Sequence, residues 1–406
     1  MIDLSGITTQ QDAFDFLDQY AVDRRMASKK LQSSKEEGMI KSYMLETDQH
    51  GDIDMQKLFS KRNWRLKELN ENFFNVKIHN RDYGFLERVS SRHIALHMIQ
   101  RSDRTDIEVK KMIQSSAQLD SVWLSGHYLN SIWNEVIKPQ RPNRYIKFKF
   151  AYEDIFREEV DRSELSDDED LIEEMSFDTE KTEHRESTLN IGMTAKKIAG
   201  VLPQLQLTLP DFKVMRMLRL PAGEKIPGGY DFWDWGKVSY HSPSFRDGRQ
   251  NLNSIIEVYQ KITEQIEQRT WFQAEKNQIN DLESTITLTG TPITFSFPIP
   301  LENSTFQNFI RIVFENGQSN FRLWGNPIRL GENKVHVYGL DMHLWQKIYM
   351  EITPSRFIVI LPQNTCGNTV HRLVTNIQSY LSPDVQVFIG DTRYQDLVKS
   401  ALFGEI

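Results

Sequence analysis

The feature that most constrains how this chain can fold is a strongly acidic segment in its middle. Residues 153–186 contain 16 Asp and Glu against four Lys and Arg. A segment with so much charge and so few apolar residues cannot bury enough surface to form a packed core. The composition therefore predicts an acidic, flexible linker at 151–190, which separates residues 1–150 from the remainder of the chain.

The region before this segment carries the opposite charge. Residues 57–149 hold 18 Lys and Arg against nine Asp and Glu, although the whole chain of 406 residues has a formal net charge of −7. Cations that neutralise phosphates supply much of the affinity of proteins for nucleic acids. The charge layout predicts a polyanion-binding surface at 57–149, with an acidic segment of the same chain that can compete for it.

Apolar spacing predicts helices before the linker. Ile94, Met98 and Ile99 recur at the spacing of one helix face. We therefore expect residues 1–150 to form a mainly helical basic domain. Its last segment, 145–150, alternates apolar and basic residues, which is the pattern of a half-buried strand.

The chain after the linker combines both periodicities. Residues 191–284 contain a loop dense in Gly and aromatic residues, followed by a long amphipathic helix expected at 250–283. Residues 285–406 contain short strand-like segments separated by turns, together with a helix expected at 369–381. This pattern predicts a mixed domain with a mainly antiparallel sheet. The expected fold class is thus α+β, with several domains.

Targeting signals are missing from the sequence. The sequence contains no run of about 18 apolar residues, which is the length that spans a membrane. The acidic N-terminus also lacks the pattern of a signal peptide. The single cysteine, Cys366, excludes an internal disulfide framework. We expect a cytoplasmic protein without membrane contact.

One group of candidate ligand-binding residues lies at 93–104. On the expected helix, His93 and His97 share one face, and Arg101 and Arg104 continue it. This face is typical of phosphate contact, although it is also compatible with an ordinary charged surface. A metal site would need a catalytic Glu between the histidines and a third ligand, so we predict no metal.

A second basic group precedes the linker. Cations and aromatic residues alternate here, so the cations can follow a nucleic-acid backbone while the aromatic rings stack on unpaired bases. The alternative is a surface strand whose lysines prevent edge-to-edge pairing. The candidate nucleic-acid-binding residues are Lys138, Arg141, Arg144, Lys147 and Lys149.

The loop 228–249 is the third candidate site. Long loops with many aromatic residues are commonly functional, and four glycines allow the backbone to turn tightly or approach a ligand. We interpret this loop as a recognition element. Its candidate contact residues are Tyr230, Trp233, Trp235, Arg246 and Arg249.

Two catalytic alternatives also fit residues of the sequence. A metal-dependent nuclease could use Asp231, Asp234 and Lys237 with His241 as base, but such centres place their acids on adjoining strands, and these residues fall in one predicted loop. A dyad of Cys366 and His371 would be a nucleophile and its base, but chance proximity explains the pair better.

The sequence therefore favours a non-catalytic, nucleic-acid-associated subunit of a larger cytoplasmic assembly, with protein partners and no cofactor. A cytoplasmic, motif-poor chain of this kind is typical of accessory proteins in prokaryotic genome defence, including antiviral defence. The alternatives are a metal-dependent nuclease or other phosphodiester hydrolase acting through the 228–249 loop, and a protein-interaction scaffold. The choice between DNA and RNA stays open.

Overall fold

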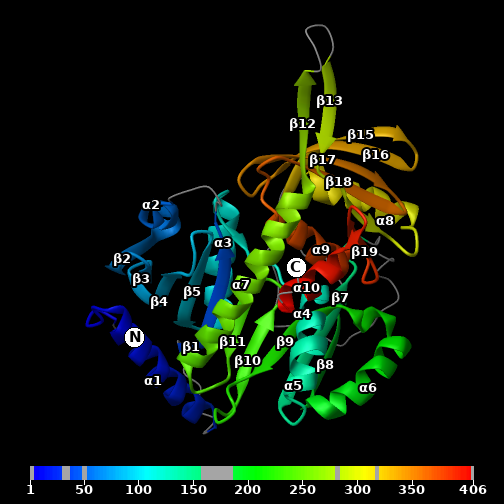
Figure 1. The fold of residues 1–406 in the computed structure, drawn as a ribbon. Coiled ribbons are helices and arrows are strands. Elements are labelled where there is room, and N and C mark those ends of the chain that lie inside the picture. Colours follow the sequence, from blue (N-terminus) through cyan, green and yellow to red (C-terminus); the bar gives the residue numbers. More distant parts are fainter. Residues whose placement is uncertain are drawn as a thin grey trace, which may run out of the picture.

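The computed structural model describes residues 4–29, 37–47, 53–156, 186–278, 284–315 and 320–403. Within these residues the chain forms helices and two mainly antiparallel sheets, so the expected α+β class is confirmed (Figure 1). None of the described helices is long and apolar enough to cross a lipid bilayer.

The first sheet is built from strands on both sides of the acidic segment. In the described residues its order is β2-β3-β4-β5-β1-β11-β10-β9-β7-β8, and β6 pairs with β1. The strands are β1 (Glu37–Glu46), β2 (Trp64–Asn70), β3 (Phe73–Ile78), β4 (Arg81–Arg88), β5 (His93–Gln100), β6 (Asp120–Ser121), β7 (Tyr145–Glu153), β8 (Glu186–Thr194), β9 (Met215–Pro221), β10 (Gly229–Trp233) and β11 (Lys237–Tyr240).

Both faces of this sheet bury apolar residues. One face contributes Ile40 and Met44 to a large core that includes residues of α1 (Gln10–Lys29) and α7 (Phe245–Thr270). The opposite face, between β2 and β1, contributes Tyr43 and Leu45 to a smaller core under α3 (Ser102–Ser115). Alternate residues of β1 therefore enter different cores, as expected for a strand covered on both sides.

The second sheet follows α7. In the described residues its order is β15-β16-β17-β18-β14-β19-β20, and β12 joins it through a short parallel pairing with β18. The hairpin of β12 and β13 projects from the molecule (Figure 1). The strands are β12 (Trp271–Gln278), β13 (Ser284–Thr289), β14 (Ile293–Ser296), β15 (Leu323–Gly331), β16 (Lys334–Asp341), β17 (Gln346–Thr353), β18 (Arg356–Pro362), β19 (Gln386–Ile389) and β20 (Thr392–Arg393).

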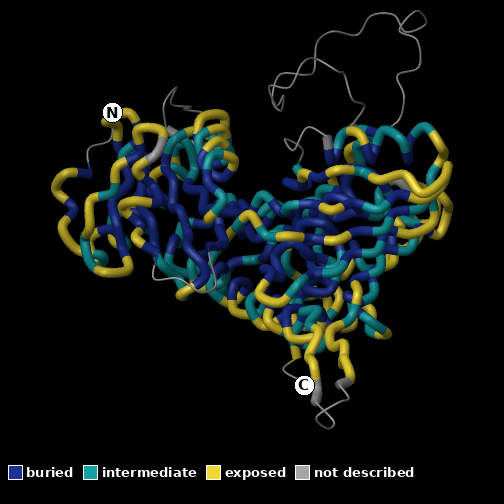
Figure 2. The backbone as a smooth tube through the Cα atoms, turned by 90° about the horizontal axis from the view of Figure 1, so that it is seen from above, coloured by how far each residue is buried: buried dark blue, intermediate teal, exposed yellow. Residues whose placement is uncertain are grey.

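Helices cover the inner face of the second sheet and join it to the first. Buried residues of both sheets form one continuous apolar cluster with these helices and with α7, and Figure 2 shows buried backbone running through the interior. The remaining helices are α2 (Met55–Phe59), α4 (Gly126–Ser131), α5 (Lys138–Gln140), α6 (Ala195–Thr208), α8 (Asn303–Ile310), α9 (Asn368–Tyr380) and α10 (Tyr394–Phe403), with π-helical turns at Ile132–Ile137 and Arg311–Glu315.

Within 1–150, the expectation of a helix at 94–99 was wrong. Residues 64–100 form the strands β2 to β5, whereas α1 and α3 are helical, so the region combines helices and strands. In β5 every residue from His93 to Ile99 is buried, because the sheet is covered on both faces. A continuous apolar run of this kind cannot be assigned to helix or strand by periodicity alone.

The regions flanking the acidic segment also differ from expectation. Residues 157–185, the main part of the predicted linker, lie outside the described residues. The ends of the predicted linker belong to β7 and β8, which pair from Tyr145–Thr194 to Glu153–Glu186. The acidic segment therefore connects two neighbouring strands of one sheet.

The 191–284 region is not loop-rich. The predicted loop at 228–249 contains the hairpin of β10 and β11 and the first turn of α7. That helix begins earlier than predicted because the Ser244 side chain accepts a hydrogen bond from the Asp247 N–H and caps it. It ends at Thr270, and the next residues form β12.

Candidate nucleic-acid interface

The two candidate histidines lie in the interior. Both are buried on β5 and not on a helix. His97 bonds through Nδ1 to Ser42 Oγ at 2.7 Å and through Nε2 to Glu87 Oε2 at 3.2 Å. His93 packs edge-on against Tyr259, and burial lowers its pKa to about 3. Neither ring can reach a polyanion, so the predicted basic face of His93 and His97 does not exist.

The other cations of the first block are distributed along the surface. Arg101 is exposed where α3 begins and forms an ion pair with Asp103 at 3.3 Å, and Arg104 is exposed on the first turn. Lys138 is exposed and Arg141 half-buried near the end of α5. These four residues stay accessible, but they are separated from the buried histidines.

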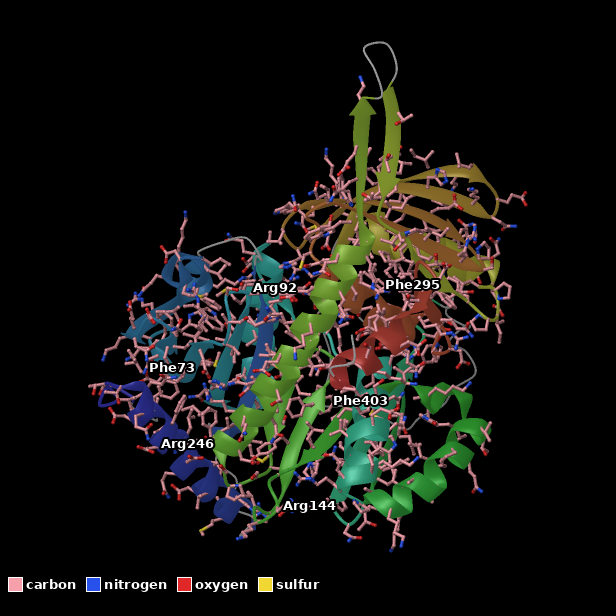
Figure 3. All side chains as sticks on the ribbon, in the orientation of Figure 1. Phe73, Arg92, Arg144, Arg246, Phe295 and Phe403 are labelled. Atoms are coloured by element: carbon pink, nitrogen blue, oxygen red, sulfur yellow. The ribbon has the colours of Figure 1, made fainter. Side chains whose placement is uncertain are left out.

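Arg144 supports the backbone of a loop. Its guanidinium donates to the carbonyls of Glu224, Ala222 and Ile226 at 3.0, 2.8 and 3.0 Å. The loop lies at the base of the molecule in the view of Figure 3. Because its donors are occupied by backbone oxygens, Arg144 is a structural residue.

Two arginines of the predicted recognition loop connect α7 to its neighbours. Arg246 forms ion pairs with Asp15 at 2.7 Å and with Asp18, both on α1 (Figure 3). Arg249 binds Glu87 of β4, with Nε 2.8 Å from Oε2. Their charges are thus neutralised within the fold.

Tyr230 is also part of the fold. It is buried, and its hydroxyl lies within hydrogen-bond distance of two acceptors, the Ser244 carbonyl at 2.9 Å and Asp247 Oδ2 at 2.7 Å. Burial raises the pKa of this hydroxyl well above its usual range. Tyr230 therefore fixes the start of α7 and offers no exposed ring for stacking.

The four residues of the nuclease alternative do not converge on one point. Asp231 is bound by Arg219 through two hydrogen bonds of 2.5 and 2.8 Å, and by His241 at 3.0 Å. Burial opposes ionisation of Asp231, but the bonds from His241 and Arg219 outweigh it and lower its pKa to about 2. The carboxylate is committed to two partners of its own sheet.

Asp234 and Lys237 have separate partners. Asp234 is bound by Arg216, and Lys237 Nζ lies 2.5 Å from Asp106 Oδ2 on α3. Burial raises the pKa of Asp234 despite its guanidinium partner. Among the described residues, no three His, Cys, Asp or Glu side chains lie close enough together to hold a metal ion.

Cys366 and His371 do not form a dyad. Cys366 is fully buried beside Arg92 and Glu46, at 3.2 and 3.3 Å from its sulfur, and burial raises the pKa of its thiol well above the usual value. His371 bonds instead to Tyr394 and Thr263. Both residues belong to the interior.

The structure does bring one set of predicted residues together. Lys149 and Trp233 each lie beside Met217 in the pairing of β7, β9 and β10, so they share a face of the first sheet. Lys237 and Lys41 follow on β11 and β1, and α3 adds Lys110 beside them. We call this group the basic sheet face; its Lys41, Lys237, Asp231 and Asp234 are buried, and its other members are half-buried. Its residues are Lys41, Lys110, Lys147, Lys149, Arg216, Arg219, Trp233, Trp235 and Lys237, with the carboxylates Asp106, Asp231 and Asp234.

The two indoles of this face position its lysines. Lys110 Nζ lies 5.0 Å from the centre of the Trp235 ring, and Lys149 Nζ lies 5.8 Å from that of Trp233. Lys237 lies within 6.0 Å of both rings. Ammonium groups over indole faces are attracted by the ring quadrupole. The rings therefore hold cations in place, which differs from the predicted stacking on bases.

The basic sheet face carries more cations than carboxylates. It holds seven cations against three carboxylates, and Arg216, Arg219 and Lys237 are ion-paired with those carboxylates. Burial, with a contribution from Lys237, lowers the pKa of Lys41 to about 7, and burial lowers that of Lys110 to about 8. The buried indole N–H of Trp233 has no acceptor among the described residues. An anion would offset the crowded charges and supply an acceptor.

Some of these residues could have been found from the sequence and others could not. Lys147 and Lys149 alternate with apolar residues, and Arg216 and Arg219 lie on the next strand in space. Lys41 and Lys110 join them from distant parts of the chain, and no local pattern marks them. Only the sheet order reveals that all of them meet.

Comparison with known proteins finds a family model that matches most of the chain. Residues 1–395 match the model of the MJECL33-like protein family. A relative from Methanocaldococcus jannaschii, named uncharacterized protein MJECL33, is 21% identical over 389 residues, which cover 90% of this chain and 89% of that protein. No solved structure shows significant similarity to the chain. With nearly its full length matched by the family model, the chain belongs to the MJECL33-like protein family.

Proposed function

We propose that this protein binds nucleic acid without catalysing a reaction, and that it does so through phosphate contacts at the basic sheet face. The observation that supports this proposal most is the grouping of lysines around Trp233 and Trp235. Because ammonium groups cover the indole faces, the rings do not stack on bases. The contacts are then between the lysines and phosphates, and they depend little on base sequence.

The proposal predicts strongly salt-dependent binding. Labelled DNA and RNA oligonucleotides, single- and double-stranded, are titrated with the protein at about 50 to 200 mM salt and followed by fluorescence anisotropy. The double variant Lys147→Glu/Lys149→Glu should weaken binding to all of them by at least about tenfold. It should also reduce the slope of log affinity against log salt by about two.

A matched control carries the same change of charge elsewhere. Lys196 and Lys197 are exposed on α6, away from the basic sheet face. Lys196→Glu/Lys197→Glu should leave affinity within about twofold of the wild type once the small long-range effect is screened by salt. Equal losses in both double variants would mean that only net charge matters, and would reject a defined site.

We further propose that the protein works within a larger assembly. The hairpin of β12 and β13 supports this part of the proposal, because Ile286 and Leu288 are exposed on it and an isolated two-stranded hairpin is marginally stable in water. Replacing both residues by Thr should release a stoichiometric protein partner from material purified from the native host. Retention of that partner would reject a contact through the hairpin.

A further inference from the structure

The outer face of the second sheet is exposed and rich in aromatic side chains. On β15 to β17 every other residue points away from the helices that cover the inner face. Three aromatic residues on three adjacent strands lie on this side: Trp324, Tyr338 and Tyr349, which are 49%, 64% and 37% exposed. Tyr338 and Tyr349 are direct cross-strand neighbours, and their rings meet edge to face at 5.4 Å.

Cations lie on the same sheet face as these rings, and Lys347 is two positions from Tyr349 on β17. Lys334, Lys347 and Arg356 are exposed on the same face of β16 to β18, since they alternate with buried residues in the same register. The carboxylate among them, Glu351, is 2.8 Å from Lys334 Nζ, 2.9 Å from His336 Nε2 and 3.9 Å from Arg356 Nη2. Bonds from Lys334 and His336 lower the pKa of Glu351, so this carboxylate is held ionised between two basic partners. The outer face thus keeps a net positive charge around its aromatic residues.

This combination differs from that of the basic sheet face. There the indoles lie under ammonium groups, whereas no ammonium or guanidinium group among the described residues lies over the ring of Trp324, Tyr338 or Tyr349. Exposed aromatic rings on an antiparallel sheet stack on unpaired bases, and neighbouring cations follow the sugar-phosphate backbone. The positive charge of the face favours a polyanion over a protein surface of mixed charge.

We propose that the outer face of the second sheet binds a single strand of nucleic acid, with Trp324, Tyr338 and Tyr349 stacking on unpaired bases and Lys334, Lys347 and Arg356 contacting phosphates. This is a second site with its own chemistry. It deepens the proposed function by adding a preference for unpaired bases, and it does not depend on the basic sheet face.

The test compares an oligothymidylate with an abasic strand of equal charge, and both with a duplex. Anisotropy is measured with an oligothymidylate of about 16 nucleotides, with an abasic strand of the same length, and with a duplex. Tyr338→Ala/Tyr349→Ala should lower affinity for the oligothymidylate at least about tenfold, because each lost stacking contact weakens binding severalfold or more. Affinity for the abasic strand and the duplex should stay within about twofold of the wild type.

Two controls separate stacking from other effects. Tyr338→Phe/Tyr349→Phe keeps the rings and should keep the affinity for the oligothymidylate. Phe403→Ala removes an exposed ring from α10, away from this sheet face, and should change nothing (Figure 3). Thermal unfolding of the alanine variant, measured on the same samples, shows that the fold is retained; loss of the cross-strand ring contact should lower its stability only slightly.

The outcomes distinguish this inference from the proposed function. Unchanged affinity for the oligothymidylate, or an equal loss on the abasic strand, would reject stacking at this face. A fall in the sedimentation mass of the alanine variant with unchanged affinity would also reject it and would assign the face to contact between copies of the chain. If Lys147→Glu/Lys149→Glu has no effect on affinity while the tyrosine variant loses affinity for the oligothymidylate alone, phosphate binding at the basic sheet face is rejected. Base stacking at the outer face of the second sheet is then supported.

Discussion

Lys41 and Lys110 lie partly or wholly buried beside further cations, and this position determines how their charge depends on pH. Burial lowers the pKa of Lys41 to about 7 and that of Lys110 to about 8, against an ordinary value of 10.5. Both side chains therefore lose their protons close to neutral pH. By contrast, Arg246 and Arg249 stay charged but are neutralised by carboxylates of other elements.

Affinity for a polyanion should fall as pH rises through this window. Below about pH 7 both lysines are charged and attract phosphate, and above about pH 8 both are neutral, so the attraction is lost. Anisotropy titrations at constant ionic strength between about pH 6 and 9 test this. Lys41→Arg/Lys110→Arg should flatten the profile, since arginine keeps its charge throughout. An identical profile in this variant would assign the pH dependence to other groups.

At the scale of elements, α7 is the part that the sequence pattern predicted best. The residues spaced three to four apart along it, from Leu252 to Ile266, are all buried. An amphipathic helix has one buried face, so its period can be read directly. The strand β5 is buried on both faces and has no such period, so the spacing of its apolar residues wrongly predicts a helix. The predicted helix start near 250 missed the capping residue Ser244.

Truncation within this buried face should destabilise the protein strongly. Ile262 is fully buried in the core that α7 shares with both sheets. Ile262→Ala removes apolar contacts and leaves a cavity, at a cost of about 2 to 5 kcal/mol in the free energy of unfolding. The neighbouring exposed residue provides the control: Lys261→Ala should change this free energy by about 0.5 kcal/mol or less. Urea denaturation measures both, and similar values for the two variants would contradict the packing described here.

At the scale of the whole molecule, two buried ion clusters join the first sheet to the later elements. Arg92 of the β4–β5 turn binds Glu46 of β1 and Glu267 of α7, each at 2.5 Å (Figure 3). Arg372 of α9 binds Asp120 of β6 and, at 2.5 Å, Asp341 of β16. Each cluster links segments more than a hundred residues apart, so each forms only when the whole chain has folded.

Removal of one member of the second cluster should be costly. Arg372→Met leaves Asp120 and Asp341 buried without their main counter-charge, which should lower the free energy of unfolding by about 3 to 5 kcal/mol. Adding Asp120→Asn and Asp341→Asn to the same variant removes the uncompensated charges and should restore part of the loss. Chemical denaturation checks both. A triple variant no more stable than Arg372→Met would show that packing of the arginine, and not charge, dominates.

The acidic segment gives a prediction from charge alone. Residues 157–185 connect β7, whose Lys147 and Lys149 belong to the basic sheet face, to β8. Replacing residues 158–185 by a neutral Gly-Ser segment of equal length should raise affinity for oligonucleotides, most at low salt where screening is weak. A scrambled segment of the same composition should behave like the wild type. Equal affinity of the neutral and wild-type proteins would leave the segment without a competing role.

The sequence by itself determined the charge layout, the buried face of α7 and the alternating strand Tyr145–Phe150, because each depends on residues close together in the chain. Only the tertiary structure decided which cations can meet a ligand. Arg249 is neutralised by a carboxylate 162 positions away and Arg246 by one 231 positions away, while Lys41, Lys110 and Lys149 converge from three separate elements. Ion pairing and burial depend on distances in space, and these are set by sheet order and not by local sequence.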